Sequence, residues 1–181
     1  MSVLQELKPI KDYHAFNAAR WEEVIADPAL EALEQRIETN RHGIILMSPN
    51  PGVDHGGWQC DVGFFLRTLL PDGKALTECP ISTSEGVKLA DNAWISRERL
   101  AKSRRKNVFV IAPEICVEVL SPTNRRGEIE EKKRLYFEGG AEDVWIVGLK
   151  GHLNFFHRDD PDTAQETSPR CPDFPRRLEA F

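Results

Sequence analysis

Two carboxylates stand where the surrounding sequence predicts a buried β-sheet. Glu118 lies inside the apolar run 115–120, and Asp91 closes one strand-like segment immediately before another. Burying a carboxylate without a partner is costly, so Glu118 requires a metal ion, a lysine or an edge position. Two carboxylates on adjacent strands can share one Mg²⁺, which usually binds one or two carboxylates together with water and a substrate phosphate. The pair therefore indicates a divalent-metal site.

A cation that could act with these carboxylates follows in the next predicted helix, over about residues 127–138. Lys132 and Lys133 share a helical face with Ile129 and Tyr136, through spacings of three and four residues. We expect Ile129 and Tyr136 to be buried, which would draw the lysines between them toward the sheet. Hydrolysis of a phosphodiester needs a cation near the attacking water or near the charge that develops on the phosphate. The helix supplies a candidate for that cation.

Each of these residues also has a purely structural interpretation. Glu118 could face water on an edge strand, and Asp91 could be an ordinary turn residue. Lys132 could pair with Glu128 on the surface of its helix. Such a pair contributes only about 0.3–0.5 kcal/mol. The sequence leaves these alternatives open.

Hydrophobic periodicity predicts the elements that position these side chains. Helical patterns cover residues 12–35, with a break at Asp27–Pro28, and a second helix begins near Asp54 as a candidate N-cap. A β-hairpin flanks residues 40–43. Further strands are expected over 75–77, 81–89 with a turn at 85–86, 92–95, 115–120, 144–147 and 153–156, with a short charged helix over 97–106. The stretch from 159 onward is expected to be loop-like, with a short terminal segment docked back. This order predicts a mixed sheet with helices packed against it.

Composition limits the class of protein. The chain has 181 residues, of which 40% are hydrophobic and 29% charged, with a net charge of −5. That charge argues against bulk packaging of DNA but allows a local basic groove. We expect neither a signal peptide nor a membrane span, because the first residues carry charges throughout and no apolar run approaches the roughly 18 residues required. The cysteines show no zinc-ligand spacing, which favours reduced thiols and a cytoplasmic location: Cys60, Cys79, Cys116 and Cys171.

The stretch from Pro113 to Gly148 resembles the signature of the Uma-two family of predicted endonucleases, within the restriction-endonuclease-like PD-(D/E)xK superfamily. The specific pieces are EVLSP at 118–122, EEK at 130–132 followed by a tyrosine four residues later, and Gly-x-x-x-x-Trp at 140–145. The resemblance covers roughly residues 37–157. It implies an α/β, restriction-endonuclease-like fold in one nuclease-like domain, with an N-terminal helical part over 1–36, a core over 37–157 and a tail over 158–181.

The resemblance also implies roles for particular residues. Asp91 and Glu118 correspond to the metal ligands of the family, and we expect the carbonyl of Val119 to assist them. Lys132 corresponds to the catalytic lysine, which in this family has moved from the strand to the following helix. The family's proline before the aspartate is Ala90 here, so the rigid turn is lost while the carboxylate is kept.

Further residues belong to a second tier. Glu38 matches an acidic position in the hairpin, although a hairpin carboxylate is often only solvated. His55 matches a histidine at the start of the next helix and would carry a proton or orient water, or else be a core histidine with satisfied partners. Candidate contacts to nucleic acid, which could equally form a solvated helix face, are the basic run at 97–106 together with Arg125, Arg126 and Lys133.

Residues and resemblance together predict hydrolysis of a nucleic-acid phosphodiester, most readily in DNA, with Mg²⁺ or Mn²⁺ as cofactor. A homodimer is expected, because a symmetric dimer most easily cuts both strands of a duplex. One alternative is a nucleic-acid-binding or regulatory module that keeps the fold without cleaving. Another is a structural or partner-binding domain.

Overall fold

A small N-terminal unit leads into the main sheet. The computed structural model describes residues 10–33, 35–122, 124 and 127–179. Asp12 and Asp27 each accept a hydrogen bond from a backbone N–H in the first turn of the helix they precede. The helices and the antiparallel hairpin that follows are α1 (Tyr13–Ile25), α2 (Pro28–Glu31), β1 (Arg36–Thr39) and β2 (Ile45–Ser48). The predicted helix break at Asp27–Pro28 and the predicted hairpin are both confirmed.

Eight strands form the main sheet, in the order β10-β9-β8-β7-β4-β3-β6-β5. The pairs β7–β8 and β3–β6 are parallel and all other pairs are antiparallel, so the predicted mixed sheet is confirmed. The strands are β3 (Gly73–Thr83), β4 (Gly86–Ser96), β5 (Arg104–Arg105), β6 (Val108–Phe109), β7 (Ile115–Val119), β8 (Asp143–Val147), β9 (Leu153–His157) and β10 (Asp160–Gln165).

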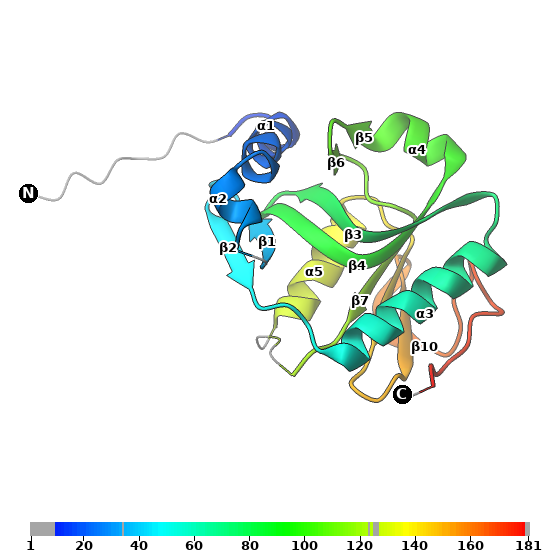
Figure 1. Ribbon diagram of the computed structural model, residues 1–181. Coiled ribbons are helices and arrows are strands. Elements are labelled where there is room, and N and C mark those ends of the chain that lie inside the picture. Colours follow the sequence, from blue (N-terminus) through cyan, green and yellow to red (C-terminus); the bar gives the residue numbers. More distant parts are fainter. Residues whose placement is uncertain (1–9, 34, 123, 125–126, 180–181) are drawn as a thin grey trace, which may run out of the picture.

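Helices cover both faces of this sheet (Figure 1). On one face, α3 (Val53–Leu69) packs its apolar stripe on β7 and β8 in a cluster that includes Trp58, Leu66, Val117 and Trp145. On the other, α5 (Glu128–Glu138) buries Tyr136 in a second cluster. β7 therefore lies in the middle of the sheet and is buried along its whole length, as its apolar sequence predicted.

Several predicted boundaries were wrong. β3 and β4 are two continuous strands of 11 residues each, because they pair along almost their whole length and this pairing overrides local turn-like sequence. The charged helix α4 (Arg97–Ser103) ends early, and the next two residues form β5. Asp54 lies inside the first turn of α3, whose N-cap is Gly52. Residues 160–165 form β10 rather than a loop.

The C-terminal tail returns to the sheet, as expected. Cys171, Phe174 and Leu178 are buried in the cluster beneath α3. A bridge between His152 and Arg177 ties the tail to the start of β9. In the part of the chain that the structure describes, no helix is both long enough and apolar enough to cross a membrane.

Candidate active site

The site begins where β4 and β7 stop pairing. Their register includes Asn92 opposite Val117, and the ladder ends there. Asp91 comes directly before Asn92 in β4, where the backbone pairing with β7 has ended. Its side chain takes the place of that pairing, because Asp91 Oδ2 accepts a 2.6 Å hydrogen bond from the Val119 N–H. The end of the ladder thus leaves a buried carboxylate, 1% exposed, beside the end of the central strand.

Glu118 and Lys132 meet on the α5 face of the sheet. Lys132 Nζ lies 3.2 Å from Glu118 Oε2 and donates a 2.9 Å hydrogen bond to the Leu89 carbonyl. One helical turn further along α5, the Tyr136 hydroxyl donates a 2.6 Å hydrogen bond to Glu118 Oε1. Both spacings follow from the i, i+4 geometry of the helix. The face predicted from sequence therefore does bring Lys132 to the buried carboxylate.

The hairpin adds a third carboxylate. Glu38 Oε1 accepts the Leu89 N–H at 3.0 Å and lies 2.8 Å from Lys132 Nζ. Two residues earlier, Arg36 reaches Asp91 Oδ1 at 2.5 Å. Residues two apart in a strand point to the same face, so β1 delivers one anion and one cation to the site together.

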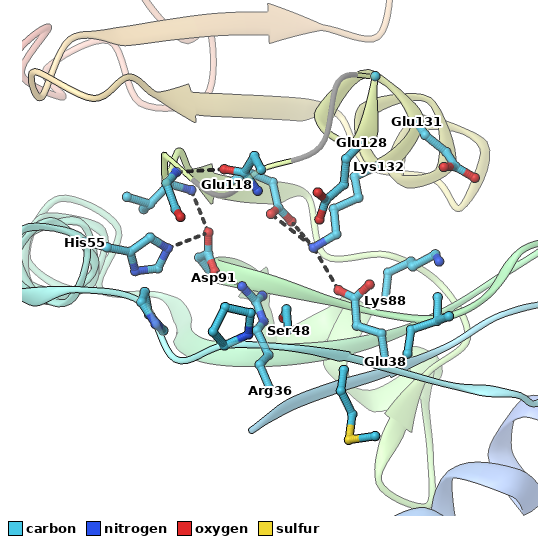
Figure 2. A pocket seen from close by; sticks show the side chains of 18 of the residues that line it. Arg36, Glu38, Ser48, His55, Lys88, Asp91, Glu118, Glu128, Glu131 and Lys132 are labelled. Atoms are coloured by element: carbon cyan, nitrogen blue, oxygen red, sulfur yellow. Dashed lines mark hydrogen bonds and ion pairs between the residues drawn. The ribbon is translucent and has the colours of Figure 1, made fainter. Parts of the chain in front are cut away.

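A cavity of about 680 Å³ opens beside these groups. Figure 2 shows His55 and Asp91 facing each other across a short gap, with Glu118, Lys132 and Glu38 joined on the other side. The apolar wall of the cavity comes from the hairpin and from the segment after it: Ile45, Leu46, Met47, Pro49 and Pro51. Such a volume lies in the range of ordinary small-molecule sites.

The pKa values of the two central carboxylates, Asp91 and Glu118, are shifted in opposite directions. Burial acts to raise the pKa of Asp91, but the hydrogen bond from His55 and the charge of Arg36 outweigh it and hold that pKa below its ordinary value. Burial raises the pKa of Glu118 to about 7, against the opposing charge of Lys132. Asp91 is therefore an anion at neutral pH, whereas Glu118 can gain or lose a proton there.

Lys132 and Glu38 are held in their charged forms. Burial acts to lower the pKa of Lys132, but the charges of Glu118 and Glu38 raise it above the ordinary value. Burial likewise acts to raise the pKa of Glu38, and Lys132 outweighs it, so that pKa is lowered. A fixed ammonium group thus lies among carboxylates at a buried position.

The carboxylate oxygens of the site suit a hard divalent cation, although the side chains do not form a complete set of metal ligands. Among residues 10–33, 35–122, 124 and 127–179, no group of three or more His, Cys, Asp or Glu side chains is arranged to hold a metal. Mg²⁺ needs only one or two carboxylates, which Asp91 and Glu118 can supply. His55 Nδ1 is buried and has no hydrogen-bond partner in the described part of the chain, so a water near the ion could satisfy it. The residues therefore fit such an ion.

The structure brings together five of the residues singled out in the sequence: Glu38, His55, Asp91, Glu118 and Lys132. Val119 also lines the cavity. Lys133 does not: it is buried, lies over the Phe156 ring at 4.1 Å and pairs with Glu130. That geometry assigns Lys133 to packing between α5 and β9. Arg125 and Arg126 lie outside the described residues.

Two residues of the site were missed in the sequence. Arg36 contacts Asp91 directly, and its position two residues before Glu38 in a strand was the available signal. Tyr136 was expected only to pack, yet its hydroxyl hydrogen-bonds Glu118. A buried tyrosine normally finds a partner for its hydroxyl, so a tyrosine on the lysine's face was also informative.

Comparisons with known proteins identify the fold and the family of the chain. The chain matches a crystal structure titled as a putative nuclease belonging to DUF820 from Anabaena variabilis, with a TM-score of 0.63, 17% identity, and coverage of 79% of this chain and 86% of that one. That likeness shows the fold, and the restriction-endonuclease-like mixed sheet is confirmed. A search of curated proteins found no similar sequence. The sequence model of the Uma2 family, described as "Putative restriction endonuclease", matches residues 21–179, and the chain therefore belongs to that family.

Proposed function

We propose that this protein is an endonuclease that hydrolyses phosphodiester bonds in nucleic acid, DNA in the first instance, with Mg²⁺ or Mn²⁺ as cofactor. One observation carries the proposal. Four elements, β1, β4, β7 and α5, bring three carboxylates and a buried lysine to one cavity. The family and the structural neighbour, both described as nuclease-like, support it.

In this proposal Asp91 and Glu118 hold the divalent ion, and the Val119 carbonyl lies close enough in sequence to assist. The ion would lower the pKa of a bound water and neutralise charge on the phosphate. In the metal-free protein, the hydrogen bond from His55 and the charge of Arg36 hold the pKa of Asp91 below its ordinary value, so Asp91 is already an anion before an ion arrives. The pKa of Glu118, near 7, lets it become an anion when a cation arrives.

Lys132 supplies the preorganised cation. Its ammonium group is fixed by Glu38, Glu118 and the Leu89 carbonyl, so little reorganisation is needed during the reaction. In a buried site its charge acts more strongly on a phosphate than it would in water. Glu38 positions Lys132 rather than touching substrate. His55 Nδ1, which has no hydrogen-bond partner among the described residues, would orient the attacking water.

One observation favours the non-cleaving alternative, a nucleic-acid-binding module of the same fold. Each central carboxylate already has a cationic partner, Arg36 for Asp91 and Lys132 for Glu118. Internal ion pairs of this kind can also be purely structural. The difference between the two functions is cleavage itself.

The test is incubation of the purified protein with supercoiled, linear and single-stranded DNA in Mg²⁺, Mn²⁺ or EDTA. We expect cleavage that requires the metal and is lost in Asp91→Asn. A matched control is Glu114→Gln, which changes a buried carboxylate outside the cavity. Metal binding without cleavage would favour the binding module, and failure to bind either metal or nucleic acid would favour a partner-binding domain.

We also propose a homodimer, because a symmetric dimer with two sites most easily cuts both strands of a duplex. Light scattering at tens of micromolar protein, with and without DNA, tests it. A mass of two chains is expected. A monomer mass in both conditions would contradict the dimer without affecting the assignment of the site.

A further inference from the structure

The Arg36 guanidinium lies between two carboxylates that face different parts of the molecule. Nη1 contacts Asp91 Oδ1 at 2.5 Å, and Nε lies 3.2 Å from Glu78 Oε2. The Asp91 contact is a hydrogen bond, whereas the Arg36 Nε–H makes no well-aligned hydrogen bond in the described part of the chain. Asp91 is 1% exposed in its side chain and Glu78 is 46% exposed. Arg36 thus makes a hydrogen-bonded ion pair with Asp91 inside the site, and an ion pair without a well-aligned hydrogen bond with Glu78 outside it.

Two positively charged side chains, Arg36 and Lys132, already lie close together beside Asp91 and Glu118. The Leu89 carbonyl accepts hydrogen bonds from both Arg36 Nη2, at 2.6 Å, and Lys132 Nζ, at 2.9 Å. A divalent ion between Asp91 and Glu118 would be a third positive group beside them. Repulsion between charges at such distances is large in a buried site. Lys132 is held by Glu38 and Glu118 on its own side of the cavity, so Arg36 is the cation with a partner available elsewhere.

The structure offers space for that movement. A second cavity, of about 410 Å³, adjoins the first, and Arg36 lines both. Glu78 lines only the second, together with Trp21, Ile37 and Leu89. A rotation of the Arg36 side chain would therefore carry the guanidinium from one cavity toward the other while β1 stays in place. A planar guanidinium can form a two-pronged contact with a carboxylate, which Glu78 does not yet receive.

Glu78 is held in an uncommon backbone conformation beside this arginine. Its φ is +47°, in the left-handed region that non-glycine residues rarely adopt. Gln59 Nε2 holds the Glu78 carboxylate, donating to Glu78 Oε1 at 2.9 Å and to the Asp91 carbonyl at 2.8 Å. Strained backbone of this kind concentrates at functional sites, where the surrounding structure maintains it. Here the result is a carboxylate kept next to Arg36, outside the main cavity.

We propose that Arg36 is the counterion of Asp91 in the metal-free protein, and that Glu78 receives Arg36 when a divalent cation enters the site. The exchange keeps Asp91 neutralised when the site is empty and frees its Oδ1 for the ion. Glu78 is then a positioning residue that sets how easily the metal enters. This inference rests on the proposed function, because it assumes that Asp91 and Glu118 bind the ion.

Calorimetric titration with Mn²⁺ tests the exchange without depending on activity. Compared with the parent chain, Glu78→Gln should bind Mn²⁺ about tenfold more weakly, because the leaving arginine loses its acceptor charge. Arg36→Gln should bind about tenfold more tightly, because its competitor is gone. In the double variant, Glu78→Gln should have no further effect, since the two residues act through one contact. Arg41→Gln and Glu85→Gln, which alter an ion pair 3.5 Å long outside the cavity lining, serve as controls and should change nothing.

A second readout follows Arg36 itself. In ¹⁵N-labelled protein the Arg36 Nε–H resonance should shift on addition of Mg²⁺, and Glu78→Gln should remove that shift. Thermal unfolding without metal checks that each variant is folded. Weaker Mn²⁺ binding by Arg36→Gln would overturn the exchange and make Arg36 an aid to the ligand. Unchanged affinity in both Arg36→Gln and Glu78→Gln would also overturn it while leaving the metal site intact. No Mn²⁺ binding by the parent chain would overturn the proposed function and this inference with it.

Discussion

Two networks of ion pairs lie at opposite ends of the paired strands β4 and β7. The cleft network comprises Arg36, Glu38, Asp91, Glu118 and Lys132. The clamp network joins Arg99 to Glu114 at 3.3 Å and to Glu142 at 2.7 Å, with Arg170 also bound to Glu142. Both consist of carboxylates and basic side chains on the same framework, yet only the cleft network lines the larger cavity.

The two networks differ in the parts of the molecule that they join. In the clamp, Glu114 accepts hydrogen bonds from the Ser96 N–H and hydroxyl, and Arg99 donates to the carbonyls of Ala112 and Gly140. These bonds tie the end of β4 to the loops around β7 and α5. In the cleft, backbone groups also hold the ion pairs, at the Val119 and Leu89 N–H groups and the Leu89 carbonyl, but the charged side chains line an open cavity. Ion pairs that join packed segments fix a fold, whereas ion pairs that line a cavity leave room for a ligand.

The largest expected effect separates two adjacent buried lysines, Lys132 and Lys133, which are 4% and 5% exposed. Lys132→Ala should lower the single-turnover cleavage rate by about a hundredfold or more, as for the loss of one preorganised donor. Lys133→Ala should leave the rate per folded molecule unchanged, because its ammonium lies over Phe156. Equal rates for Lys132→Ala and the parent chain would remove the catalytic cation from the account.

The clamp network should respond in stability instead. Arg99→Ala removes the cation that joins Glu114 and Glu142, and we expect the free energy of unfolding to fall by about 2–3 kcal/mol, less than for a fully buried pair because Arg99 is partly exposed. Denaturant titration measures this change. The Mn²⁺ affinity of the folded variant should stay at the parent value. A loss of metal binding with unchanged stability would reverse the roles given to the two networks.

A smaller effect distinguishes the two carboxylates of the cleft by pH. The pKa of Glu118 is raised to about 7 by burial, so its contribution to the free energy of unfolding is fully present below its ordinary pKa and is lost as pH rises through 7. The pKa of Asp91 is lowered, so its contribution is present at neutral pH and is lost only in acid. Between pH 5 and 8, the metal-free parent should lose stability relative to Glu118→Gln. Melting curves in which the two proteins stay parallel would refute this assignment.

The sequence predicted the central strand and its helix well, because each carries a strong local signal. Glu118 is a lone carboxylate in an apolar run, and Lys132 and Tyr136 share a helical spacing. Those signals were enough to place the lysine beside the buried glutamate. The family match over residues 21–179 includes the stretch 37–157 that carried the resemblance.

What the sequence left out depends on contacts between distant segments. The pairing of β3 with β4 overrides the turn-like residues between the predicted short strands. Arg36 and Asp91 are 55 residues apart, and only the docking of β1 on β4 brings them together. Lys133 and Lys132 are both spaced three or four residues from Ile129 and Tyr136, so the sequence does not distinguish them. The contact with the Phe156 ring on β9 determines where the Lys133 ammonium lies. Local periodicity selects a helix face but does not identify the partner on it.

The central claim is that the cleft network, and not the clamp network, binds a divalent ion. Calorimetric titration with Mn²⁺ compares the parent chain with Asp91→Asn, Glu118→Gln and Glu114→Gln, which change three buried carboxylates at the two ends of the same strand pair. The account predicts binding by the parent and by Glu114→Gln, and no binding by Asp91→Asn or Glu118→Gln. Unchanged Mn²⁺ affinity in both cleft variants, or a loss of binding only in Glu114→Gln, would contradict it.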